Sequence, residues 1–116
     1  MKMLHITIRT NRFEEEMRFF LNYVGLKIER DLRPQGRNMV FLANAAGETC
    51  IEIIEREEAE NAGNEQLSIG FQTEDVEKKR EELLADGFEV TPMIRPMPNV
   101  KFFFVKDPAG VKIQFI

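Results

Sequence analysis

The sequence predicts an α+β fold made of two copies of one β-α-β-β-β unit. Three observations support this prediction. Short alternating segments recur at residues 5–10 and 68–73, and an amphipathic helical stretch follows each of them. Residues 40–47 and 103–110 then match as strands that run into a glycine turn, and each copy closes on one further strand. One small insertion or deletion separates the copies.

In the first copy, residues 5–10 alternate as a half-buried strand does. The helix that follows places its apolar side chains three and four residues apart on one face: Phe13, Met17, Phe20, Leu21 and Val24. Asn11 and Glu14 have the spacing of a capping box at its start, and Gly25 suits its end. The last strand of this copy covers residues 50–54.

In the second copy, Val76, Leu83 and Leu84 mark a helix that ends near Gly87. The turn Asp107-Pro108-Ala109-Gly110 leads into the last strand, residues 112–116. Residues 91–99 contain three prolines and two methionines, which predicts an irregular loop.

The length of 116 residues allows one domain with a modest core. We expect a single domain over 1–116, with module 1 at about 1–55 and module 2 at about 67–116. An acidic linker rich in Glu, Asn and Gly joins the modules, and its charges predict a solvated connector.

Composition excludes several classes of protein. Lys and Arg number 16 and Asp and Glu 20, for a net charge of −4, so we expect no nucleic-acid partner. No run of about 18 apolar residues predicts a membrane helix, and no signal-peptide pattern follows Met1. The single cysteine, Cys50, rules out an internal disulfide and a cysteine-rich zinc site. A cytoplasmic protein is the expectation.

Strand alternation assigns side chains to the two faces of each sheet. Leu4, Ile6 and Ile8 face the helix, and His5, Thr7 and Arg9 face the other way. Four polar residues at matching positions of the repeat share the face that no helix covers: His5, Glu52, Ser68 and Gln114. The only histidine is either an exposed residue or a metal ligand, and its pairing with Glu52 keeps the second possibility open.

These residues resemble the vicinal oxygen chelate superfamily, the group of glyoxalases, bleomycin-resistance proteins and extradiol dioxygenases. The resemblance covers nearly the whole chain. It is most specific at residues 5–9, at 19–26 and at 105–114, where an Asp-Pro-x-Gly turn leads into the final strand. It implies two βαβββ modules whose curled mixed sheets form a cavity, with the helices on the outer face.

The resemblance also implies a divalent metal (Ni, Zn, Mn or Fe) held by one residue from each first and last strand. His5, Glu52 and Gln114 are the implied metal ligands, and Ser68 takes the fourth position, where a hydroxyl is a poor donor. Family members carry His at the position of Ser68 and Glu at that of Gln114. Glu52 is the only carboxylate of the four, and so the implied catalytic base.

Four further residues are candidates for substrate binding: Arg9, Ser68, Phe103 and Met97. Arg9 resembles the arginine that anchors a glutathione carboxylate in glyoxalase I, although a surface arginine is an equal interpretation. Arg56 lies in the neighbourhood where that family carries an asparagine. Consecutive Phe102, Phe103 and Phe104 must place at least one ring on the open face. Met93 and Met97 could line an apolar pocket or fill the core.

Two functions therefore remain open. The first is a metal-dependent lyase or isomerase of the glyoxalase kind, acting on a small oxygenated substrate through an enediolate-type intermediate. The second is a metal-free binding or antibiotic-resistance protein of the bleomycin-resistance type, which sequesters a small molecule. An extradiol dioxygenase is less favoured, because it needs a second histidine. Both functions predict a homodimer, whose cavity combines modules of one chain or of two.

Overall fold

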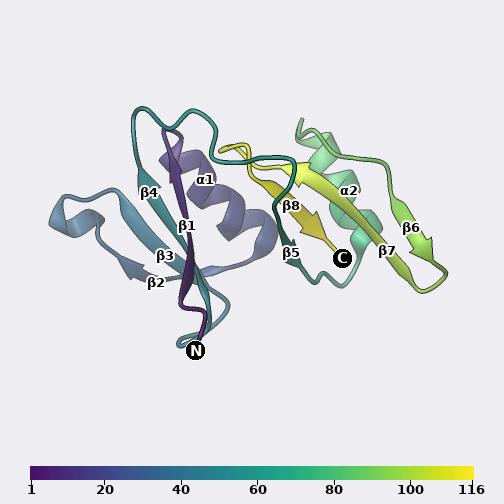
Figure 1. Ribbon diagram of the computed structural model, residues 1–116, viewed down its shortest axis with the longest axis horizontal. Coiled ribbons are helices and arrows are strands. Elements are labelled where there is room, and N and C mark those ends of the chain that lie inside the picture. Colours follow the sequence, from purple (N-terminus) through teal and green to yellow (C-terminus); the bar gives the residue numbers. More distant parts are fainter. The chain divides into compact units, whose positions relative to one another are not determined.

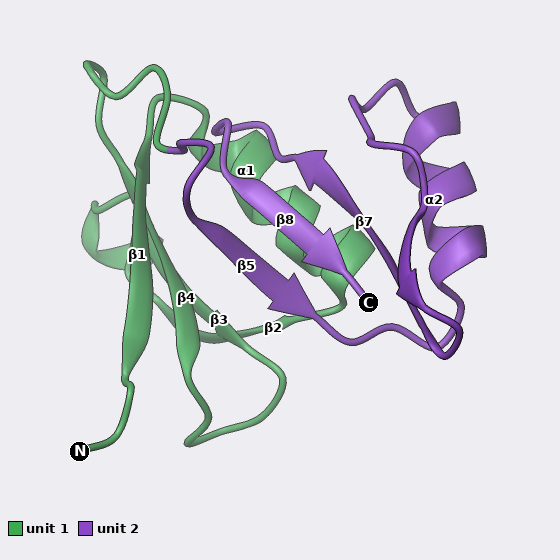
Figure 2. Ribbon diagram, turned by 45° about the vertical axis from the view of Figure 1, so that its right-hand side comes forward, with its two compact units in different colours: residues 1–62 green, residues 63–116 purple.

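The computed structural model describes residues 1–116 and divides into two compact units, residues 1–62 and 63–116 (Figure 2). The division falls inside the predicted linker. No helix in either unit combines the length and apolarity needed to cross a lipid bilayer.

The first unit contains one four-stranded sheet in the order β1-β4-β3-β2 (Figure 1). Its β1 and β4 are parallel, and its other neighbours are antiparallel. The elements in chain order are β1 (His5–Thr10), α1 (Phe13–Phe19), the π-helical turn η1 (Phe20–Val24), β2 (Lys27–Asp31), the 3-10 turn η2 (Arg33–Gln35), β3 (Met39–Ala43) and β4 (Cys50–Glu55).

The second unit repeats this topology, with strands in the order β5-β8-β7-β6. Here β5 and β8 are the parallel pair. The elements are β5 (Ser68–Phe71), α2 (Val76–Ala85), β6 (Ile94–Met97), β7 (Val100–Lys106) and β8 (Lys112–Phe115). The matching strand orders confirm the predicted pair of βαβββ modules.

Each unit buries the apolar face of its sheet together with its helix. In the first unit, Ile53, Val40 and Leu42 are fully buried, and Phe13 and Phe20 of the helical segment are buried as well. In the second, the buried set consists of Phe103, Val105, Ile113 and Phe115 of the sheet with Val76 and Leu83 of α2. Leu4 is an exception to the predicted alternation, since it precedes β1 and is 64% exposed.

Two local predictions were wrong. Helix α1 begins after Arg12, whose amide donates to the Thr10 hydroxyl, and no side chain caps the helix, so Asn11 is not its cap. Residues 91–99 are not all irregular, because residues 94–97 form β6 and pair with β7. Pro96 has no amide hydrogen to donate. It is compatible with β6 because this strand lies at the edge of its sheet, where no further strand would accept a hydrogen bond on the outer side.

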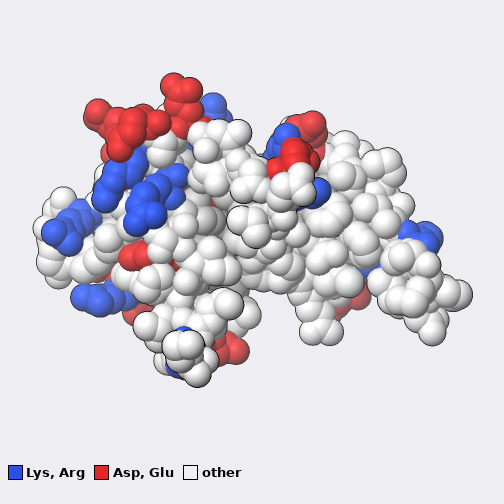
Figure 3. All heavy atoms as spheres, viewed as in Figure 1, with Lys and Arg blue, Asp and Glu red and all other residues white.

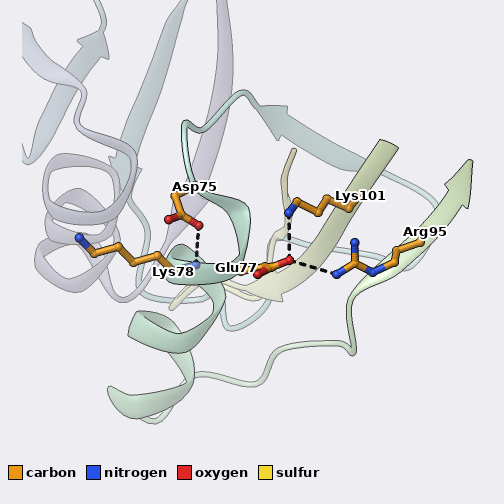
Figure 4. Close-up of polar contacts among 5 residues, drawn as sticks. All are labelled: Asp75, Glu77, Lys78, Arg95 and Lys101. Atoms are coloured by element: carbon orange, nitrogen blue, oxygen red, sulfur yellow. Dashed lines mark hydrogen bonds and ion pairs between the residues drawn. The ribbon is translucent and has the colours of Figure 1, made fainter. Parts of the chain in front are cut away.

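Helix α2 is tied to its sheet by one carboxylate (Figure 4). Asp75 caps the helix by accepting from the Lys78 amide at 3.0 Å. One residue into the helix, Glu77 accepts from Lys101 of β7 at 2.9 Å and from Arg95 of β6 at 3.1 Å. These two cations lower the pKa of the Glu77 carboxyl below its usual value of 4.5.

This lowered pKa predicts a loss of stability in acid. The folded pKa of Glu77 lies below its unfolded value, so the carboxylate contributes stability above about pH 4.5 that disappears as the pH falls through the folded pKa. We expect Glu77→Gln to lower the melting temperature slightly at pH 7 and to change it little at pH 3. Thermal melts from pH 2 to 7 would measure this. Glu81→Gln, on the same helix without an ion pair, is the control; an equal loss there would contradict the prediction.

Candidate functional site

The parallel pairing of β1 with β4 brings His5, Thr7 and Glu52 together on the open face of the first sheet. In this register His5 lies opposite Cys50 and Thr7 opposite Glu52. The Thr7 hydroxyl donates to Glu52 Oε1 at 2.5 Å, and His5 Nε2 lies 3.5 Å from the same oxygen. The Glu52 side chain is 11% exposed and that of His5 41%, so a largely buried carboxylate adjoins an accessible imidazole.

The two oxygens of Glu52 have different surroundings. Oε1 carries the Thr7 hydrogen bond and faces the imidazole. Oε2 accepts no hydrogen bond from the protein, yet it is not among the side-chain atoms closed off from solvent. One oxygen is therefore held in place by Thr7, and the other carries no hydrogen bond from the protein.

Phe41 of β3 forms the wall next to this pair, because its register partner is Glu52. Its ring makes an edge contact with the His5 ring, at 5.9 Å between centroids. The Arg30 guanidinium lies 5.8 Å from the Phe41 centroid, within the range of a cation–π contact. On this side the His5 imidazole therefore contacts an aromatic ring and not a polar side chain.

His5 and Glu52 have suitable geometry for two ligands of one metal ion. Two donors at about 2.1 Å from a tetrahedral ion are about 3.4 Å apart, close to the 3.5 Å between His5 Nε2 and Glu52 Oε1. No third His, Cys, Asp or Glu side chain completes the group. The first unit therefore contributes two donors of the kind a metal requires.

Several Lys and Arg side chains lie over the first unit, with Asp and Glu side chains beside them (Figure 3). A pocket of about 500 Å³ opens between the segment after η2 and the end of β4, and its walls are Gly36, Arg37, Asn38, Met39, Ile54, Glu55, Arg56 and Glu57. Arg9 adjoins it, because it is the register partner of Ile54. Neither Arg9, Arg37 nor Arg56 takes part in an ion pair.

Arg33, unlike these three arginines, forms an ion pair with a carboxylate. It donates from Nε and Nη2 to both oxygens of Asp31, at 2.9 and 2.8 Å. These hydrogen bonds lower the pKa of the Asp31 carboxyl and raise that of the Arg33 guanidinium. The pair fixes the turn that precedes the pocket, and Arg37 is the arginine of this segment that lines the pocket.

Ser68 and Gln114 occupy the matching positions of the second unit. Ser68 pairs with Lys112, and Gln114 pairs with Gly70, so the register of the first unit is repeated. A Cβ at position 70 would lie 2.9 Å from Gln114 Oε1, which means that the amide of Gln114 rests over the glycine. Gly70 occupies the position that matches Thr7. Gln114 therefore has no neighbouring hydroxyl of the kind that donates to Glu52 in the first unit.

The structure places Phe103 away from the open face. It is fully buried and stacks on Phe115, at 5.6 Å between ring centroids. Phe102 and Phe104 take the other face, where their rings meet edge to face at 5.6 Å. The alternation of β7 requires this, because Phe103 and Val105 fill the core. Met97 lies on β6 and is 59% exposed.

Sequence reasoning did not single out Thr7, Phe41, Phe104 or Lys112. A signal for the two phenylalanines is present in the repeat, since Phe41 and Phe104 occupy the same position of their units and pair with Glu52 and Gln114. Lys112 matches Cys50 in the repeat and lies 4.4 Å above the Phe104 ring. The role of Thr7 depends on a rotamer, which no sequence pattern encodes.

Comparison with known proteins agrees with this architecture. Lactoylglutathione lyases of Neisseria meningitidis serogroups A and B are each 28% identical over 124 aligned residues, which cover all of this chain and 90% of each relative. Among solved structures, the trypanothione-dependent glyoxalase I of Leishmania major is similar with a TM-score of 0.76 and 21% identity, over 100% of this chain and 86% of that one.

Two further structures show how widely this fold is used. A possible glyoxalase from Bacillus cereus matches with a TM-score of 0.75 and 21% identity, over 100% of this chain and 98% of that one. An antibiotic-binding protein from Streptomyces sp. CB03234 matches with a TM-score of 0.72 and 16% identity, over 99% and 93%. The family model of the Glyoxalase/Bleomycin resistance protein/Dioxygenase superfamily matches residues 2–115, and the chain therefore belongs to this superfamily.

Proposed function

We propose that the protein is a metal-dependent lyase or isomerase of the glyoxalase type that acts on a small oxygenated substrate, such as a 2-oxoaldehyde adduct. The observation that carries the proposal is the convergence of His5 and Glu52 on one accessible face, with Thr7 fixing one carboxylate oxygen. The full-length likeness to lactoylglutathione lyases supports the same reaction class.

Glu52 moves the proton in this proposal. Its Oε1 is held by Thr7, while Oε2 is open to a substrate carbon that carries an acidic hydrogen next to a carbonyl. The carboxylate accepts this proton and returns it to the adjacent carbon, while the hydroxyl proton on the first carbon passes to the former carbonyl oxygen, so the substrate is isomerised with no net gain or loss of atoms. The separate surroundings of the two oxygens allow one carboxylate both to face a metal and to act as a base.

His5, Glu52 and Gln114 are the proposed ligands, with Ser68 as a weaker fourth. A bound divalent ion would polarise the substrate carbonyl and so acidify the neighbouring carbon. Gln114 brings a neutral oxygen, which leaves more of the ion's positive charge uncompensated than a carboxylate would.

Arg9 and the pocket beside it orient the charged end of the substrate. The guanidiniums of Arg9, Arg37 and Arg56 lack carboxylate partners, so each can form a charge-assisted hydrogen bond with a substrate anion. Ser68 and Met97 remain proposed contacts of the second unit. Phe104, rather than the buried Phe103, is the ring of β7 that we assign to the substrate face.

A metal-free binding protein is the second candidate. It is favoured by the donor set, since only two of the four family positions carry a strong ligand and no three acidic, histidine or cysteine side chains cluster. The structure of similar fold from Streptomyces is an antibiotic-binding protein, so binding of a small molecule is a function that this fold can have.

Metal retention separates the two candidates. We expect untagged protein soaked in nickel, zinc, manganese or ferrous iron to keep about one equivalent of at least one ion after desalting, because His5 and Glu52 chelate it together. Mass spectrometry of the metal content would measure this. His5→Ala should lose the metal, since it removes the only histidine. Retention of none of the four ions by the natural protein would favour the binding protein.

Activity tests the role of Glu52. With the hemithioacetal of methylglyoxal and glutathione as substrate, we expect Glu52→Gln to lower kcat/KM at least about 100-fold, because the base is lost. The absorbance of the thioester product would report the rate. Glu48→Gln, an exposed carboxylate just before β4, is the matched control. Comparable activity of the Glu52 and Glu48 variants would contradict the assignment.

The proposal includes a homodimer. Each sheet ends in strands that pair on one side only, β1 and β2 in the first unit and β5 and β6 in the second. Such edges can pair with or pack against another copy. We expect sedimentation to give twice the chain mass of 13.5 kDa at micromolar concentration. A mass equal to one chain across the accessible concentration range would contradict the dimer.

A further inference from the structure

The second unit contains a small pocket near the β7–β8 turn that shares only Phe104 with the residues assigned to the proposed chemistry. Its volume is about 220 Å³, and its walls are Glu65, Glu89, Val90, Thr91, Phe104, Val105, Lys106 and Lys112. We propose that this pocket binds a small monocarboxylic acid with a compact apolar body, and that Glu65 occupies the carboxylate position in the free protein. The inference goes beyond the proposed function, because it requires neither His5 nor Glu52.

Two ammonium groups define the anion position. Lys106 and Lys112 are register partners at the end of the β7–β8 pair, so they project from the same face. Glu65 reaches both of them, with Oε1 3.4 Å from Lys106 Nζ and Oε2 3.9 Å from Lys112 Nζ. One carboxylate therefore bridges two cations, which is the arrangement that an incoming carboxylate would reproduce.

The bridge is loose enough to be displaced. The Lys112 distance exceeds that of a hydrogen bond, and the Glu65 side chain is 68% exposed. Ion pairs with such exposure contribute little stability. Glu65 stays nearby because the linker lies against the β7–β8 turn, where a Cβ on Gly63 would be only 1.9 Å from the Gly110 carbonyl oxygen.

The apolar wall is already in place. The Phe104 ring lies 4.4 Å from Lys112 Nζ, and Val90 and Val105 form a bridge beside it. Thr91 fixes this wall, since its amide donates to the Phe104 carbonyl at 2.9 Å and its hydroxyl accepts from the Phe104 amide at 3.0 Å. A ligand would meet a pocket that needs no backbone rearrangement.

Charge and size select the class of ligand. Glu89 also lines the pocket, so two ammonium groups, Glu89 and one ligand carboxylate sum to zero charge once Glu65 is displaced. A dianion would leave excess negative charge in the pocket, which disfavours a phosphate monoester. The volume lies below that of pockets for drug-sized ligands, and it suits a single ring or a short branched chain.

Benzoate is the probe for the full-length, metal-free protein. Titration followed by amide chemical shifts should give saturable changes at Thr91, Lys106 and Lys112, and neutral benzamide should give none. Lys112→Met should weaken benzoate binding about fivefold or more, because it removes half of the anion position. Glu65→Gln should strengthen binding about two- to fivefold, because it removes the internal competitor.

The chain supplies a matched control on the opposite face of β7. Glu77 bridges Lys101 and Arg95 as Glu65 bridges Lys106 and Lys112. Glu77→Gln and Lys101→Met should leave benzoate affinity unchanged, and melting curves would verify that every variant is folded. Unchanged affinity in Glu65→Gln, or equal binding of benzamide, would overturn the proposal. A metal-retention failure at His5 would leave it intact, so the two proposals can fail separately.

Discussion

The parallel pairing of the first and last strands of each unit is the contact on which the rest of the structure depends. In the first unit it joins residues 45 positions apart, such as Thr7 and Glu52, and in the second it joins Gly70 to Gln114. Parallel strands cannot be joined by a tight turn, so the chain must cross over through a helix, and the helix then covers one face of the sheet. The other face is left open, and β1 and β4 align their polar residues on it. The position of the helix and the position of the candidate site are thus two results of one pairing.

The two units share this framework but have diverged in the residues on the open face. Each keeps a phenylalanine next to the key polar residue of its last strand, Phe41 beside Glu52 and Phe104 beside Gln114. The first unit adds an imidazole and a hydroxyl to its carboxylate. The second carries an amide over a glycine, together with a lysine above its phenylalanine. The first unit therefore presents an imidazole, a hydroxyl and a carboxylate on its open face, and the second presents an aromatic and cationic surface.

The sequence predicted the strands, the helices and their two-fold repetition because these depend on local alternation and on glycine positions. It also predicted that His5 and Glu52 share a face, since this requires only that side chains alternate between the two faces along each strand. It missed β6, because Pro96 argues against a strand unless the edge position is known. Asn11 was assigned as a cap on spacing alone, but helix α1 begins after Arg12 and no side chain caps it. Phe103 was placed on the wrong face. Three consecutive phenylalanines do not indicate which of them faces the core, and only the structure shows that Phe103 is buried together with Val105 and Phe115.

The division of each strand into core-facing and open-facing residues has an evolutionary consequence. A substitution at position 5, 68 or 114 changes the chemistry of the open face, and the packing of residues such as Ile53 and Ile113 against the helices does not depend on it. Selection on folding and selection on activity therefore act on alternate residues of the same strands. A lineage can lose a ligand, acquire a lysine or exchange one substrate for another in single steps, with the scaffold intact at every intermediate. In this chain His5 and Glu52 stand on the open face of one unit, and Ser68 and Gln114 take the matching positions of the other, while the core residues of both units are apolar.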